Sequence, residues 1–275
     1  MQPPSSPAAT LRWSGHTDVG RVRKNNEDSF LGLQFDAREV SYLGKIGEAS
    51  LAERDAVFAV SDGMGGANAG EFASRITVEK ITRVLPRAFQ QGATGTAQGT
   101  DEVLAELFDQ IHRALSFLGG SYEECAGMGA TLSLCWFTPQ AMHFAHIGDS
   151  RIYYLPAAGT GMLQITQDDT YVGWLFRQGQ INEREARNHP GRASLQKALG
   201  AGNRYVDPQV GTVLYEPGDR FLLCTDGLVD GCFDSQLGEF LGAPPAILNP
   251  AQQLVTDSVQ IAGRDNTTAL LVEIR

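Results

Sequence analysis

Residues 56–66 read AVFAVSDGMGG, an apolar run that ends on Asp62 and continues into glycines. The run is short, rich in β-branched and aromatic residues and bounded by a turn, which is typical of a buried strand. Such a strand carries the carboxylate of Asp62 to its tip, where Gly63 lets the chain turn away. A single Asp-Gly pair is ordinary turn chemistry, so its meaning depends on whether other strands end in the same way.

Three other apolar runs place an aspartate beside a strand end. RFLLCTD ends on Asp226, Asp149 follows MHFAHIG, and Asp265 lies just before TTALLVEI. Carboxylate oxygens are hard ligands that suit Mg²⁺ and Mn²⁺, and a metal site draws them from different chain segments. Like charges gathered at one mouth repel each other unless cations offset them. The recurrence therefore predicts a divalent metal site built from separate strands.

The remaining pattern indicates the fold class. Apolar runs predict further strands at 130–137 and 151–155, and helical spacing predicts helices at 71–85, 100–115, 182–188 and 250–262. Hairpin-like strand pairs beside pairs of long helices exclude a regular βαβ repeat and favour packed sheets with helices outside. The loosest stretches, Asp36–Arg54 and Gln90–Thr100, are interpreted as surface connections. The first is a tolerated loop insertion or, alternatively, a recognition element, and the second joins two helices.

Composition limits the possible partners. The 275 residues are 42% hydrophobic, enough to bury a sizeable core, and the net charge is −10, from 32 acidic against 22 basic residues. An acidic surface repels nucleic acid and anionic lipid, so we expect neither as a partner. The four cysteines form no CxxC pair and are interpreted as buried reduced thiols.

The first ten residues, MQPPSSPAAT, lack a basic start and an apolar core, so they do not resemble a secretory signal. We expect a disordered lead-in over 1–10 and a single catalytic domain over 11–275. No apolar stretch approaches the length of a membrane span, and the predicted location is cytoplasmic.

Two further patterns concern ligands. His143 and His146 are three apart in a predicted strand and point to opposite faces, so they cannot chelate one ion. We interpret all five histidines as structural or surface residues. In GRVRKNNEDSF, Arg23 precedes Glu27 and Asp28. Its guanidinium could hold a phosphate bidentately while the acids face metals, or it could form a solvated surface ion pair.

Six motifs in order, RKNNED, SDGMGG, GATLSL, IGDSRIYYL, CTDGLVD and GRDNTT, resemble those of the metal-dependent protein phosphatases, the PPM or type 2C family, in its bacterial form. The resemblance extends from about Ser14 to Glu273. It implies an α+β fold, a four-layer α-β-β-α sandwich of two antiparallel sheets flanked by helices, with a small flap subdomain at about 166–199.

The resemblance also implies roles for particular residues. Asp62 would bridge two Mn²⁺ or Mg²⁺ ions, the Gly63 carbonyl would bind one of them, and Asp226 and Asp265 would complete the carboxylate set. Glu27 and Asp28 would act through bound water, and Arg23 would hold the substrate phosphate. With Asp226, Asp149 and Asp230 match a weaker third metal site.

Three positions depart from the pattern of some relatives. Met64 stands where animal members carry a histidine thought to protonate the leaving group, which leaves the general acid unassigned. His146 replaces an asparagine that commonly precedes the GDS motif, and Asp169 replaces a histidine at the head of the flap.

The expected activity is hydrolysis of phosphoserine and phosphothreonine in proteins by a hydroxide that bridges two metals, without a phosphoenzyme. By analogy, the phosphoprotein substrate would have a cognate bacterial Ser/Thr kinase, and we expect a monomer. The alternative function is a binding or sensor module that keeps the fold but catalyses weakly. Loss of a metal carboxylate would mark that class, and here Asp62, Asp226 and Asp265 are all present.

Overall fold

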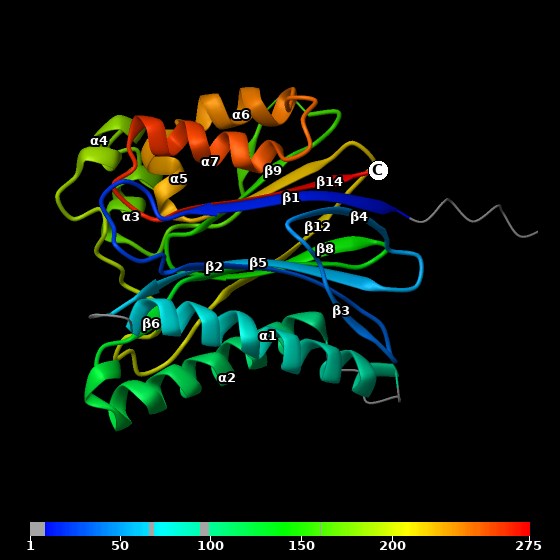
Figure 1. The fold of residues 1–275 in the computed structure, drawn as a ribbon, viewed down its shortest axis with the longest axis horizontal. Coiled ribbons are helices and arrows are strands. Elements are labelled where there is room, and N and C mark those ends of the chain that lie inside the picture. The colour runs from blue at the N-terminus through cyan, green and yellow to red at the C-terminus, as the bar shows by residue number, and fades with distance from the viewer. Residues whose placement is uncertain (1–8, 66–68, 94–98, 160) are drawn as a thin grey trace, which may run out of the picture.

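The protein is described here by a computed structural model covering residues 9–65, 69–93, 99–159 and 161–275. Two antiparallel sheets pack face to face, and helices cover the outer face of each (Figure 1). This is the predicted four-layer α-β-β-α sandwich. None of the helices in these ranges has the length and apolarity needed to cross a membrane.

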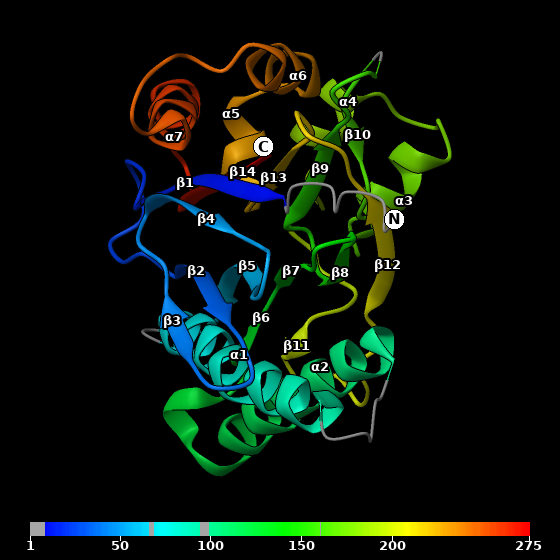
Figure 2. The same ribbon diagram turned by 90° about the vertical axis from the view of Figure 1, so that its right-hand side faces the viewer.

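One sheet has six strands and is covered by helices from the C-terminal part of the chain (Figure 2). Its order is β10 (Leu163–Gln164), β9 (Arg151–Leu155), β13 (Arg220–Cys224), β14 (Thr267–Ile274), β1 (Thr10–Asp18) and β4 (Ile46–Ser50). Its helices are α5 (Asp226–Gly231), α6 (Asp234–Gly242) and α7 (Pro250–Ile261).

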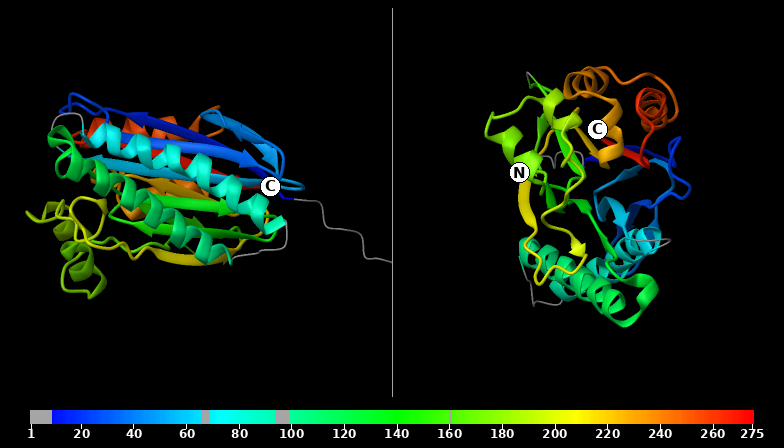
Figure 3. Two further views of the ribbon diagram at one scale, coloured as in Figure 1. Left: turned by 90° about the horizontal axis from the view of Figure 1, so that it is seen from below. Right: turned by 90° about the vertical axis from the view of Figure 1, so that its left-hand side faces the viewer.

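The other sheet has eight strands and is covered by two long helices, α1 (Ala69–Ala93) and α2 (Thr100–Ser121) (Figure 3). Its order is β11 (Leu199–Gly200), β6 (Gly129–Ala130), β5 (Asp55–Met64), β7 (Leu132–Phe137), β8 (Ala141–Ile147) and β12 (Gln209–Leu214). β2 (Asp28–Phe35) pairs with β5 and with β3 (Val40–Tyr42).

The remaining helices are short. A 3₁₀ turn, η1 (Glu123–Cys125), follows α2, and the flap holds α3 (Tyr171–Arg177) and α4 (Glu183–Asn188). The capping box of Asn182 and Glu185 fixes the start of α4, because each side chain accepts a hydrogen bond from the other residue's backbone N–H.

The apolar run of β5 follows from its place in the sandwich. Val57 and Ala59 face the core beneath α1 and α2, whereas Phe58 and Val60 face the core between the sheets. Side chains alternate along a strand, so a strand covered on both faces needs apolar residues at every position. Phe58 packs edge-to-face on Phe137 between the sheets, with ring centroids 5.9 Å apart.

The Asp36–Arg54 tract differs from the prediction of a surface loop insertion. It contains β3, which pairs with β2 in one sheet, and β4, which pairs with β1 in the other. The indole Nε1 of Trp13 donates to the Gly44 carbonyl at 2.8 Å, and the Trp13 ring lies where a side chain on Gly47 would be. The tract is therefore part of the sandwich.

Smaller differences lie at element boundaries. β1 begins at Thr10, one residue before the predicted start, and residues 1–8 of the predicted lead-in lie outside the described residues. α1 extends to Ala93, and 94–98 of the predicted connection also lie outside. Asp226 begins α5 instead of ending β13. The four cysteines are free and buried, as predicted.

Candidate active site

Two aspartates on neighbouring strands, one of them buried, lie opposite each other at one end of the sandwich. The antiparallel register of β2 and β5 places Asp28 directly opposite Asp62. One residue further along β5, the Gly63 N–H donates to the Glu27 carbonyl at 3.1 Å. The sequence motifs RKNNED and SDGMGG, more than 30 residues apart, thus form one wall of the site.

The other sheet contributes hydroxyl groups to the same wall. The Thr225 hydroxyl, between β13 and α5, donates to Asp28 Oδ2 at 2.7 Å, and the Thr268 hydroxyl of β14 donates to the same oxygen at 2.7 Å. Hydrogen bonds of this kind orient a ligand carboxylate and tune its basicity. The sequence analysis did not identify either threonine, although each lies within three residues of a predicted ligand.

Two buried carboxylate oxygens of the site have no hydrogen-bond partner among the described residues. Asp28 Oδ1 and Asp226 Oδ1 are buried and accept no hydrogen bond. Burial raises the pKa of Asp62 well above its usual value, and the charges of Asp28 and Asp226 raise it further. An unpartnered buried oxygen is costly, and a cluster of hard oxygen donors is what Mg²⁺ or Mn²⁺ binds. The donor set therefore fits divalent cations.

Arginines engage two of the predicted ligands. Arg23 Nη2 lies 2.7 Å from Asp265 Oδ2, and Arg192 Nη1 forms an ion pair with Asp230. Among the described residues, no three His, Cys, Asp or Glu side chains are already arranged to hold one ion. The two arginines offset charge on Asp265 and Asp230, because like charges that lie close together repel one another.

Asn266 organises the loop that carries Arg23 and Glu27. Its Oδ1 accepts from the Glu27 N–H at 2.7 Å, and its Nδ2 donates to the carbonyls of Val19 and Asn25, at 2.9 Å each. One buried amide therefore holds the N-terminal loop against the turn before β14. The residue is visible in the GRDNTT motif, but its role depends on contacts across about 240 residues and has no local signal.

Close packing explains the glycines around Asp62. A Cβ on Gly63 would lie 1.8 Å from the Gly70 carbonyl oxygen, and one on Gly70 would lie 2.6 Å from Glu27 Oε1. Neither position can accept a side chain without displacing backbone or a predicted ligand. The first turn of α1 is thus pressed against the carboxylate site.

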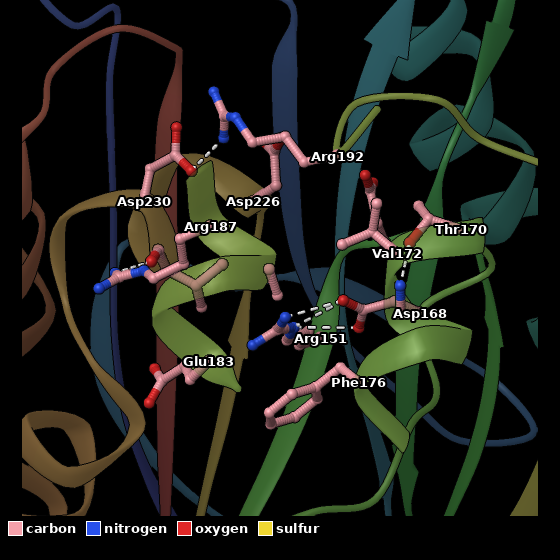
Figure 4. Close-up of a pocket in the computed structure, with 14 residues that line it drawn as sticks. Arg151, Asp168, Thr170, Val172, Phe176, Glu183, Arg187, Arg192, Asp226 and Asp230 are labelled. Carbon is pink, nitrogen blue, oxygen red and sulfur yellow. Dashed lines mark hydrogen bonds and ion pairs between the residues drawn. The ribbon is translucent and has the colours of Figure 1, made fainter. Parts of the chain in front are cut away.

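The flap forms the other side of the site, around a cavity of about 70 Å³ that Asp149, Asp226 and Asp230 help to line. Figure 4 shows Asp230 meeting Arg192 on one side and Asp168 meeting Arg151 on the other. Asp168 accepts from Arg151 Nε at 3.0 Å and from Nη2 at 2.8 Å, a two-point contact that anchors the start of the flap.

α4 is anchored separately. Arg187 Nη2 donates to the Val229 carbonyl and, at 2.8 Å, to that of Cys232, and the guanidinium carbon lies 3.9 Å from the centre of the Phe233 ring. The sequence analysis identified the flap by resemblance, but it missed Arg151, Arg187 and Arg192, because their partners are distant in the chain.

Two of the positions that depart from the family pattern, His146 and Asp169, form hydrogen bonds within the fold. His146 is fully buried, its Nδ1 lies 2.8 Å from the Ser133 hydroxyl, and burial lowers its pKa to about 4. Asp169 accepts from the Gly148 N–H at 3.0 Å and so ties the head of the flap to the residue before Asp149. His143 is half-buried and bonds to Thr212 at 2.9 Å, so the structure gives it the predicted structural role.

Comparisons with known proteins identify the family of the chain. The family model described as "Protein phosphatase 2C" matches residues 46–273. The serine/threonine phosphatase stp of Listeria innocua is 31% identical over 258 residues, which are 94% of this chain and 93% of the relative. A solved serine/threonine phosphatase from S. agalactiae superposes with a TM-score of 0.76 at 27% identity, covering 96% of this chain and 100% of the other.

The PstP phosphatase of Mycobacterium tuberculosis gives a TM-score of 0.73 at 31% identity, with 96% of this chain and 98% of the solved chain covered. A further structure of the PstP catalytic domain, at 29% identity and a TM-score of 0.73, covers 97% of this chain and 99% of that one and is in complex with two manganese ions. The chain belongs to the protein phosphatase 2C family. It is a serine/threonine protein phosphatase of the bacterial type and a metal-dependent hydrolase.

Proposed function

We propose that the chain hydrolyses phosphoserine and phosphothreonine at a dinuclear centre formed around Asp62, Asp226 and Asp265. The observation that carries the proposal is the pair of buried, unpartnered oxygens, Asp28 Oδ1 and Asp226 Oδ1, beside Asp62. PstP, whose solved catalytic domain holds two manganese ions, supports the same metal count for this chain.

We propose a role in this centre for each of the predicted residues. Asp62 would bridge the two cations with the Gly63 carbonyl beside it, and Glu27 and Asp28 would bind through water, with Thr225 and Thr268 fixing the Asp28 carboxylate. Two divalent ions, when bound, supply a water of lowered pKa and offset charge on the phosphate. Water oxygen adds to phosphorus, the bond from phosphorus to the serine or threonine oxygen breaks, and that oxygen takes a proton.

Arg23 is proposed to bind the substrate phosphate. Its side chain is 48% exposed and is held by Asp265, one of the predicted metal ligands. A cation bound by Asp265 competes with the guanidinium for that carboxylate, which frees Arg23 for a phosphate oxygen. Arg23 would then bind an oxygen of the substrate phosphate.

A third, weaker cation position is proposed at Asp149 and Asp230 with Asp226. Burial raises the pKa of Asp149 and that of Asp226, and the charge of Asp149 raises the pKa of Asp226 further. Asp230 already holds the Arg192 guanidinium, so an ion at this position would have to replace it.

The test is hydrolysis of a phosphothreonine peptide with Mn²⁺, with Mg²⁺ and with chelator, by the unmodified protein and by Asp226→Asn. Activity should need the cation and fall at least about a hundredfold in the variant, because loss of a ligand exceeds the effect of losing its hydrogen-bond partner. Asp101→Asn, at an exposed acid in the first turn of α2, is the matched control.

Two companion measurements test this route: the first separates it from a covalent one, and the second shows that water attacks phosphorus and that the phosphorus–oxygen bond is broken. Acid quenching during turnover of ³²P-labelled peptide should leave no label on the protein. Hydrolysis in ¹⁸O-water should place one labelled oxygen in each phosphate released. Full activity of Asp226→Asn, or a labelled protein, would contradict the proposal.

The physiological partner is proposed as a phosphoprotein modified by a Ser/Thr kinase, on the analogy of the bacterial relatives. The monomeric state and the cytoplasmic location stay predictions from the sequence. Gel filtration with light scattering checks the first, and fractionation of cells that express the full gene checks the second.

A further inference from the structure

A groove lies beside the candidate active site, between the start of α1 and the end of α2. Its volume is about 730 Å³, and we call it the α1–α2 groove. Its lining includes Glu71, Phe72 and Arg75 from α1, Leu118 from α2, Glu124 from η1, and Tyr122 between α2 and η1. In Figure 1, α1 begins and α2 ends at the same end of the sandwich as the flap helices α3 and α4, on the opposite outer face.

The walls of the groove expose aromatic rings. Phe72 of α1 is 48% exposed and Tyr122, the residue after α2, is 52% exposed, and Leu118 also lines the groove. Single exposed apolar side chains are common, but rings gathered around a hollow mark a binding surface. A hollow of about 730 Å³ with this lining can take up a bulky apolar side chain of a partner.

The groove is continuous with the carboxylate site. Gly70 precedes Glu71 and lies against the Glu27 carboxylate and the Gly63 carbonyl. From Gly70 to Arg75 the helix rises about 7.5 Å, which an extended peptide spans in about two or three residues. A chain with its phosphoresidue at Asp62 would therefore reach the groove within about four residues.

The charge of the groove selects among such chains. Glu71 and Glu124 contribute two negative charges against the single positive charge of Arg75. Arg75 is already engaged, with Nη1 3.3 Å from Glu71 Oε1. Glu124 lies in the part of the lining that η1 forms, and Glu123 beside it is exposed as well. A basic side chain that follows an apolar one would complement this part of the lining.

We propose that the α1–α2 groove binds the substrate segment next to the phosphoresidue, with a bulky apolar side chain between Phe72 and Tyr122 and a Lys or Arg at Glu124. This inference rests on the proposed phosphatase function and adds a substrate preference to it. It makes Phe72, Tyr122 and Glu124 specificity-determining residues, distinct from the groups that carry out hydrolysis.

The experiment measures Mn²⁺-dependent kcat/KM for phosphothreonine peptides in an alanine background. Leu and Arg are placed together at positions two to four residues from the phosphothreonine, on either side, and p-nitrophenyl phosphate is the small reference ester. Rates on each peptide are divided by the rate of the same variant on the ester. One arrangement should exceed the all-alanine peptide about tenfold, through KM, because burying one apolar side chain contributes that much.

Variants then assign the preference to the groove. Phe72→Ser and Tyr122→Ser should each remove most of it, and Glu124→Lys should make Asp better than Arg at the basic position. Phe117→Ser is the matched control, since Phe117 lies on α2, is 68% exposed and is not among the residues that line the groove. It should keep the unmodified preference.

The outcomes separate the two proposals. Hydrolysis of the ester with no preference among peptides, or a preference that survives in Phe72→Ser and Tyr122→Ser, overturns the groove assignment alone. A dimer that Phe72→Ser converts to monomer, with peptide preference unchanged, assigns the groove to a second copy and also overturns it. Absence of hydrolysis of both ester and peptides with Mn²⁺ overturns the proposed phosphatase function and this inference with it.

Discussion

Arg192→Gln tests whether the flap and a divalent cation compete for Asp230. In the unmodified chain, an ion at the proposed third position must replace the Arg192 guanidinium, which forms an ion pair with Asp230. The variant removes that cationic competitor and keeps a polar, uncharged side chain. We therefore expect the third ion to bind more tightly, with the two tighter ions unaffected.

The magnitude follows from the exposure of the pair. The Arg192 side chain is 29% exposed and that of Asp230 is 12% exposed, so the contact lies between a surface pair and a buried one. Such a pair contributes about 1–2 kcal/mol. Removing it should raise the apparent affinity for the weakest ion by roughly 5- to 30-fold.

Two assays read the effect. Isothermal titration calorimetry with Mn²⁺ should show that the affinity of the weakest binding phase rises by this factor in Arg192→Gln. The affinity should be nearly unchanged in Arg192→Lys, and the phase should be absent in Asp230→Asn. Acrylamide quenching of tryptophan reports on the flap, since Trp174 of α3 is 43% exposed whereas Trp13 is 7% and Trp136 is 6% exposed. Quenching should rise when the third ion binds to the unmodified protein and should be high from the start in Arg192→Gln.

Two results would refute this reasoning. Identical Mn²⁺ isotherms for the unmodified protein and Arg192→Gln would mean that Arg192 does not compete for the site. Quenching of Trp174 that does not change with Arg192 or with the third ion would mean that the ion pair does not hold the flap.

Three other predictions concern the site and the core. Thr268→Val removes a hydroxyl bonded to Asp28 and should weaken Mn²⁺ binding about 10- to 100-fold by titration, with little change in melting temperature. Gly70→Ala should also lower Mn²⁺ affinity and activity, because the new methyl would lie 2.6 Å from the Glu27 carboxylate, whereas Gly120→Ala, in open space, should leave both unchanged. Burial raises the pKa of Asp55 to about 6, so its neutral form is favoured in the folded state. Its contribution to stability is then present below about pH 4 and lost as the pH rises to about 6, a change of about 2–3 kcal/mol. The free energy of unfolding, measured in urea, should fall by this amount between pH 4 and pH 7.5 in the unmodified protein relative to Asp55→Asn, so that the variant is the more stable at pH 7.5. Parallel pH profiles of the two proteins would contradict this prediction.

The aspartates of the site were predictable because each follows a local rule. Asp62 and Asp149 lie at the ends of apolar runs, and Asp265 lies just before one, so the pattern that predicts a strand also predicts where the carboxylate lies. The ordered motifs then indicated the family, and the family model confirmed it.

The features that the sequence analysis missed depend on contacts between segments that are distant in the chain. Asp36–Arg54 reads as a loop because β3 and β4 are short and become strands only by pairing with β2 and β1. Asn266 and Arg192 carry ordinary polar side chains, and their partners are fixed by the fold. Periodicity does not encode such pairings.

The pairing of β1 with β14 affects how the phosphatase is made. β14 lies between β1 and β13 in its sheet, and the Thr10 N–H donates to the Arg275 carbonyl at 2.9 Å. During synthesis on the ribosome, β1 emerges before the other strands of this sheet, and its partner β14 emerges after them. Until β14 arrives, the edges of β1 and β13 are open to other chains, and neither Asp265 nor Asn266 is in place. A nascent chain interrupted before this point would have no assembled metal site, and so could not remove phosphate from the proteins around it.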